Sequence, residues 1–150
     1  MNMDRIRQLT QLRKLYREQK EAAWRQSRRA VLFSPEMYRH DGEYDGWSLA
    51  AKQAGAVAGL VSKGLPAEDA LRFLRAELER FLIEFRRYAS VNTQYAFNES
   101  YHAGVVQALR EALDAARALS RRARRGSRKQ KRSPMEWAKP AALTPAERRS

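Results

Sequence analysis

The stretch LRFLRAELERFLIEFRRY, Leu71 to Tyr88, decides the fold class of this chain. Leucine or an aromatic residue returns every three or four positions with arginine and glutamate between, which is the period of a helix packed on a core. Pro66 suits the first turn, so we predict a helix over residues 66–89. We expect its core-facing residues to be Leu71, Leu74, Leu78, Phe81, Leu82, Phe85 and Tyr88.

Three further helices are predicted around this one. Nothing breaks a helix over residues 4–33 until Pro35, which disfavours helical backbone in the residue before it. Apolar spacing predicts two more helices, over residues 47–63 and 92–125. Residues 36–46 are polar and are expected to form a connector. Since no window alternates like a strand, the sequence predicts an all-α bundle of about four helices.

The predicted helix over residues 47–63 carries small residues at four-residue spacing. This pattern lets another helix approach closely, so we expect a tight packing seam with a neighbouring helix or with a second chain. The two rows of the seam are Ala51, Gly55 and Gly59, and Ala50, Ala54 and Ala58.

The composition limits the class of protein. The chain has 150 residues, 43% of them hydrophobic, which suits one domain with a modest core. It has no cysteine, so disulfides and thiolate metal sites are excluded. The first residues lack the apolar run of a signal peptide, and the longest weakly apolar stretch, residues 54–61, is too short to span a bilayer. We expect a cytoplasmic protein with no membrane partner.

The net charge of +13 is concentrated at the two ends of the chain. Residues 1–30 contain 9 basic and 3 acidic residues, residues 31–120 contain 10 and 12, and residues 121–150 contain 11 and 2. This asymmetry indicates a polyanionic partner, most often nucleic acid. We therefore expect a helical domain over residues 1–120, followed by a basic arm and tail over residues 121–150.

The run RRARRGSRKQKR, Arg121 to Arg132, is the most specific functional feature of the sequence. Like charge at this density resists compact folding, so we expect the tail to be partly disordered and to order on a polyanion. A second contact is expected from the basic face of the first helix, at Arg17, Arg25, Arg28 and Arg29. The residues of the run expected to bind phosphates are Arg121, Arg122, Arg124, Arg125, Arg128, Lys129, Lys131 and Arg132.

An acidic stretch contrasts with these basic segments. Asp41, Glu43, Asp45 and Gly46 match the first half of an EF-hand loop, but Lys52 occupies the position of the bidentate glutamate. The sequence therefore does not predict a calcium site. Our hypothesis is that the three acids hold the basic run intramolecularly and compete with nucleic acid for it.

The sequence offers no recognisable catalytic or cofactor site. Glu99 and His102 have the spacing of one half of a di-iron site, but His40 lacks a matching glutamate for the other half. Phosphate-binding loops, dinucleotide fingerprints and nucleophile turns are absent. A helix-turn-helix over residues 51–82 is disfavoured, since its second helix opens with acids. We expect no metal, no cofactor and no enzymatic activity.

Together these patterns predict a nucleic-acid-binding accessory or architectural protein with little sequence specificity. The alternative is a helical protein-interaction module, or a small subunit of a larger complex, that docks through the first helix and Trp137. Trp137 stands among prolines and charges, as isolated anchor residues often do. The sequence leaves open DNA or RNA, single or double strands, and the oligomeric state.

Overall fold

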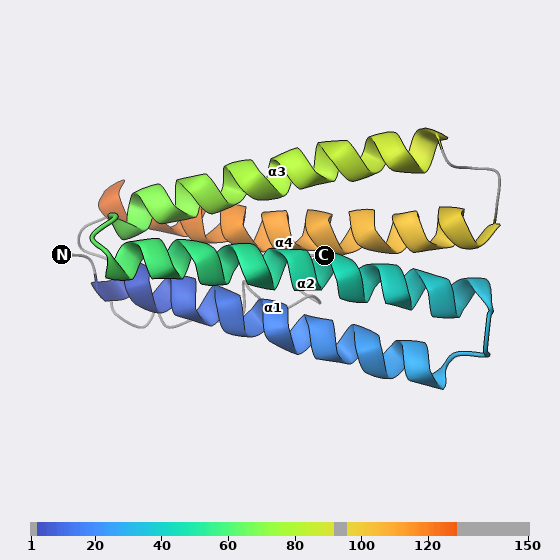
Figure 1. Cartoon of the computed structure of the whole chain (residues 1–150). Coiled ribbons are helices and arrows are strands. Elements are labelled where there is room, and N and C mark those ends of the chain that lie inside the picture. Colours follow the sequence, from blue (N-terminus) through green and yellow to red (C-terminus); the bar gives the residue numbers. More distant parts are fainter. Residues whose placement is uncertain (1–2, 92–95, 129–150) are drawn as a thin grey trace.

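The computed structural model describes residues 3–91 and 96–128, and within them it contains four helices and no strand (Figure 1). The predicted all-α bundle of four helices is confirmed. Of the predicted tail, residues 121–128 continue the last helix, and residues 129–150 lie outside the described part. The helices are α1 (Met3–Arg29), α2 (Pro35–Ser62), α3 (Ala67–Val91) and α4 (Ala96–Arg128).

The junction between α1 and α2 differs from the prediction. The first helix ends at Arg29 rather than at residue 33, and Ser34 caps the next helix by accepting a hydrogen bond from the Met37 amide at 3.2 Å. Pro35 follows at the first helical position, where its missing N–H costs nothing. The predicted connector over residues 36–46 is therefore wrong, because the proline that stops one helix also starts the next.

The closest helix contact joins α2 and α4, which run in the same direction (Figure 1). A Cβ added to Gly42 would lie 1.9 Å from the carbonyl oxygen of Tyr101, and one added to Gly104 would lie 2.0 Å from that of Arg39. Only glycine fits there, so the two backbones touch in the second and third turns of both helices.

The predicted small-residue seam is only half right. Ala50 and Ala54 are fully buried, as expected for one of the two rows. Gly55 of the other row lies against the Arg13 side chain, and Gly59 has no atom within 4 Å of its would-be Cβ. The seam therefore follows the row Gly42, Gly46, Ala50 and Ala54. The first two residues of this row were not predicted because they lie in the segment that was expected to be a connector.

The core is built mainly from leucine and alanine of all four helices. Tyr16 of α1 is fully buried and donates a hydrogen bond of 2.6 Å to the carbonyl oxygen of Ala112 in α4. Its ring lies 5.8 Å from that of Trp47, so one side chain ties α1 to both central helices. The buried leucines predicted for α3 are confirmed, namely Leu71, Leu74, Leu78 and Leu82.

The aromatic end of α3 is less buried than predicted. Phe81 and Phe85 are half-buried, and Tyr88 is 52% exposed. In Figure 1, α3 leans away from α2 toward its C-terminal end, so the last turns face fewer neighbours. Tyr88 instead lies 6.4 Å, ring to ring, from His102 of α4.

Candidate nucleic-acid interface

The basic run begins as a direct extension of α4. The helix continues through the predicted domain boundary at residue 120 and ends at Arg128, so five of the eight predicted phosphate contacts stand on helical backbone. Positions 121, 124, 125 and 128 have the spacing of one helical face. Lys129, Lys131, Arg132 and Trp137 lie outside the described residues.

The four predicted contact residues of α1 are exposed. Arg25 forms an ion pair with Glu21, with 3.9 Å between the Nη1 atom of Arg25 and a carboxylate oxygen of Glu21. The Arg28 guanidinium lies 4.7 Å from the centre of the Trp24 ring. Within the described part of the chain, no ion pair joins Arg17, Arg28 or Arg29 to a carboxylate. These side chains can therefore meet a phosphate without first breaking an ion pair.

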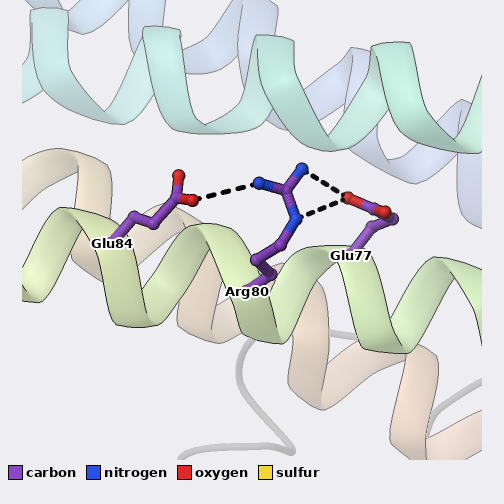
Figure 2. A network of polar contacts seen from close by, with 3 residues as sticks. All are labelled: Glu77, Arg80 and Glu84. Carbon is purple, nitrogen blue, oxygen red and sulfur yellow. Dashed lines mark hydrogen bonds and ion pairs between the residues drawn. The ribbon is translucent and has the colours of Figure 1, made fainter.

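An arginine of α3 illustrates the opposite condition (Figure 2). The Nη2 atom of Arg80 lies 2.7 Å from Glu77, and its Nη1 atom lies 3.0 Å from Glu84. The hydrogen bond to Glu77 is the main cause that raises the pKa of Arg80 above its usual value. Two carboxylates already surround this cation, so Arg80 presents a weaker attraction to phosphate than Arg28 and Arg29 do.

The structure does not bring the two predicted basic surfaces together. Ser27 of α1 contacts Asp41 of α2, and Gly42 contacts Tyr101 of α4, so these residues share one end of the bundle. Arg121 follows Tyr101 by twenty residues of helix, which is about 30 Å at 1.5 Å per residue. The basic run therefore leaves the bundle at the end where α1 begins, and Arg28 and Arg29 lie at the other (Figure 1).

The acidic stretch lies on helix α2, and each acid has a partner. Ser27 donates a hydrogen bond to Asp41, and the Tyr101 hydroxyl donates one to Asp45. Nδ1 of His40 lies 2.6 Å from Oε1 of Glu43. A helical backbone cannot make alternate side chains converge as an EF-hand loop does. Among the residues described, no three His, Cys, Asp or Glu side chains are grouped to hold a metal.

Burial and Asp45 together raise the pKa of Tyr101 above its usual range, with burial the larger cause. The neutral phenol thus fixes α4 to α2 beside the Gly42 contact. Competition of these acids for the basic run stays a prediction. The acids lie at the opposite end of the bundle from residues 121–128.

His102 belongs to a cluster of aromatic rings. Its ring lies 5.3 Å from Tyr101 and 6.4 Å from both Phe85 and Tyr88. Glu99, its predicted companion, is exposed. These ring contacts give His102 a packing role that joins α3 to α4.

A group of exposed apolar residues between α1 and α2 was not predicted from the sequence. Val31, Leu32 and Phe33 are 75%, 70% and 70% exposed, although the prediction placed them in a helix. The Ser34-Pro35-Glu36 signature of a capped helix start would have revealed the loop before it.

Comparisons of the chain with protein-family models, with curated proteins and with solved structures find no match. In the described part of the chain, no helix has the length and apolar character needed to cross a membrane. The function must therefore be inferred from the residues and their geometry.

Proposed function

We propose that the protein is a nucleic-acid-binding accessory or architectural protein that contacts phosphates with little sequence specificity. One observation carries this proposal: α4 runs without a break into a segment that holds five arginines in its last eight residues and no acid. A helix that ends in a dense cationic run presents its charges from a fixed base, and the core buries the earlier turns of the same helix. We place this activity in the cytoplasm.

The chemistry of the run favours phosphate over base edges. Arginine binds phosphate with two parallel hydrogen bonds, and it stays charged at any physiological pH. Each phosphate that is neutralised releases condensed counterions, so the affinity must fall steeply with salt. If about six of the cations meet phosphates, the logarithm of the affinity for duplex DNA should change with the logarithm of salt concentration with a slope of about −5.

The exposed arginines of α1 supply a second, weaker contact in this proposal. Arg28 and Arg29 lie about 30 Å or more from the base of the run, so both surfaces can engage one nucleic acid only if it lies along the bundle. That arrangement suits a protein that covers or bends nucleic acid, and it does not suit one that reads a short sequence.

The test is fluorescence-anisotropy binding of the full-length protein to labelled duplex DNA, single-stranded DNA and RNA at several salt concentrations. A variant with all eight cations of the run replaced by glutamine is measured beside it. We expect salt-steep binding to at least one nucleic acid and a loss of about 100-fold or more in the variant at low salt. Binding that is absent at low salt, or that survives the substitutions, contradicts the proposal.

A protein-interaction module is the second candidate, and one feature of α3 favours it. Phe73 is a large aromatic side chain and is 48% exposed. An exposed aromatic side chain of this kind can anchor in a partner's pocket, and such a contact depends little on salt. In this candidate α1 and Trp137 contribute further contacts. Association with another protein that does not weaken as salt is added would favour this candidate over nucleic-acid binding.

A further inference from the structure

The loop between α1 and α2 forms an apolar tip at one end of the bundle, defined as Val31, Leu32 and Phe33. These three consecutive side chains are among the most exposed large apolar groups of the described chain. Contiguous apolar exposure of this kind marks an interaction site on most water-soluble proteins.

The backbone holds the tip in a defined shape. Phe33 has a φ of 61°, in the left-handed region that a bulky side chain disfavours. Its amide hydrogen-bonds to the sulfur of Met37 at 3.4 Å, and the Ser34 amide donates to the Val31 carbonyl oxygen at 3.0 Å. Ser34 also caps α2, so both helices anchor the loop. The structure thus maintains an unfavourable conformation that keeps an apolar ring in solvent.

Cations lie directly behind the tip. Arg28 and Arg29 are exposed in the last turn of α1, and Arg28 stacks on Trp24, which is 47% exposed. Glu36 is the exposed acid nearest in sequence, in the first turn of α2. Asp41 is engaged by Ser27. The order from the end of the bundle inward is therefore apolar groups, then arginines, then an amphipathic indole.

From this order we propose that the tip docks onto the surface of an anionic lipid membrane. The three apolar side chains would enter the boundary between headgroups and acyl chains, Arg28 and Arg29 would meet lipid phosphates, and Trp24 would lie at the interface. This is attachment to a surface without spanning it. It revises the expectation, made from the absence of a spanning segment, that the chain has no membrane partner.

Other occupants fit the tip less well. Phe33 offers one ring on which an unpaired base could stack, but the two aliphatic side chains beside it offer none and suit an acyl-chain environment better. Three residues present far less area than the roughly 800 Å² per partner of a stable dimer, which disfavours a second copy of the chain. The proposal does not depend on nucleic-acid binding, since the basic run leaves the opposite end of the bundle.

The absence of cysteine allows a direct test on the full-length chain. Val31→Cys carries a polarity-sensitive dye at the tip, and Leu32 and Phe33 remain in place. Ile83→Cys is the matched control, because Ile83 is an apolar residue 52% exposed on the side of the bundle. Each labelled protein is mixed with vesicles of phosphatidylcholine alone, and with vesicles that also contain phosphatidylserine.

We expect the dye at position 31 to brighten and shift to shorter wavelength with the anionic vesicles, and the dye at position 83 to stay unchanged. Adding Leu32→Asp and Phe33→Asp should weaken this response at least about tenfold. It should leave any salt-sensitive adsorption through the basic run in place. Replacing Arg28 and Arg29 by glutamine should reduce the preference for the anionic lipid.

Three outcomes would overturn the proposal. The first is no response of the dye at position 31 to the anionic vesicles. The second is an equal response at positions 31 and 83. The third is a tip that responds to oligonucleotides and not to lipid. In the last case the tip would belong to the nucleic-acid surface. Since the dye reports only the tip, failure of nucleic-acid binding would leave this result unaffected.

Discussion

Both ends of the bundle carry arginines, but they differ in packing and in the groups that accompany the arginines. At the end that carries the α1–α2 loop, glycine brings α2 and α4 into backbone contact and apolar side chains stand in solvent beside arginine. Toward the other end, Gly55 lies against a side chain, Gly59 is open, and the arginine run continues α4. The difference teaches that arginines can serve different chemistry: cations alone attract phosphate, and cations behind apolar groups suit the surface of an anionic membrane.

The largest expected effect tests the difference in packing. Replacing Gly42 by alanine should lower the free energy of unfolding by roughly 3 kcal/mol, because the new Cβ would lie 1.9 Å from the Tyr101 carbonyl oxygen. Neither backbone can yield without separating α2 from α4. Urea unfolding followed by circular dichroism measures this change.

Gly59→Ala is the matched control on the same helix. No atom lies within 4 Å of its would-be Cβ, so helix propensity alone should raise the free energy of unfolding by up to about 1 kcal/mol. Equal losses at the two positions would show that the ends are not packed differently.

The next prediction concerns nucleic-acid binding by exposed arginines on the bundle itself. Replacing Arg17, Arg25, Arg28 and Arg29 by glutamine should weaken binding to DNA or RNA about tenfold at low salt. The control replaces Arg72, Arg80, Arg86 and Arg87 of α3, which removes the same total charge. Its expected effect is smaller because carboxylates already engage Arg80 and Arg72. Anisotropy titrations that give equal losses would mean that only net charge matters.

A pH-dependent effect is expected at the end that carries the α1–α2 loop. The pKa of Tyr101 is raised in the folded protein above its ordinary value of 10.0. Above that pH the unfolded chain loses the phenolic proton and the folded chain keeps it, so stability should fall as pH rises. Tyr101→Phe should lose stability less steeply between about pH 9 and pH 11 in urea unfolding. Parallel curves for the two proteins would count against the buried contact with Asp45.

The smallest expected effect compares acids at the two ends. If Asp41, Glu43 and Asp45 compete for the basic run, replacing all three by their amides should tighten nucleic-acid binding about two- to threefold at low salt. Glu68→Gln with Asp69→Asn provides the comparison, since α3 begins at the end where the run emerges. No change in the triple variant would refute the competition hypothesis, and a larger change in the pair would assign the competition to Glu68 and Asp69. Unfolding curves check that each variant remains folded.

Local patterns predicted most of the fold. The apolar period of Leu71 to Leu82 was sufficient to predict a buried helix face. The second helix ends at Ser62, one residue before the predicted end, and Gly64 follows with a φ of 112°. The prediction of a connector over residues 36–46 was wrong because the polarity of this segment suggested a loop, although it is part of α2. Gly42 and Gly46 face α4 there, and their lack of a side chain hides the packing face from any hydrophobic pattern.

The candidate interface was predictable only in part. The charge of the run and of α1 follows directly from composition, but their separation by the length of the bundle does not. Phe33 looked like the last residue of a helix, because an apolar residue at a helix end fits the same period as one in the core. Its exposure depends on where α1 stops and on what α2 leaves uncovered.

The sequence by itself determined that this chain is helical, that its charge lies at its two ends, and that its last helix runs into an arginine-rich segment. These properties depend on spacing and composition within a few turns of chain. Only the tertiary structure decided that glycines join α2 to α4, that Asp41 and Asp45 are engaged by α1 and α4, and that the apolar tip and the basic run lie at opposite ends. The physical reason is that these features depend on which backbones approach one another, and contacts between residues far apart in sequence leave no periodic signal in it.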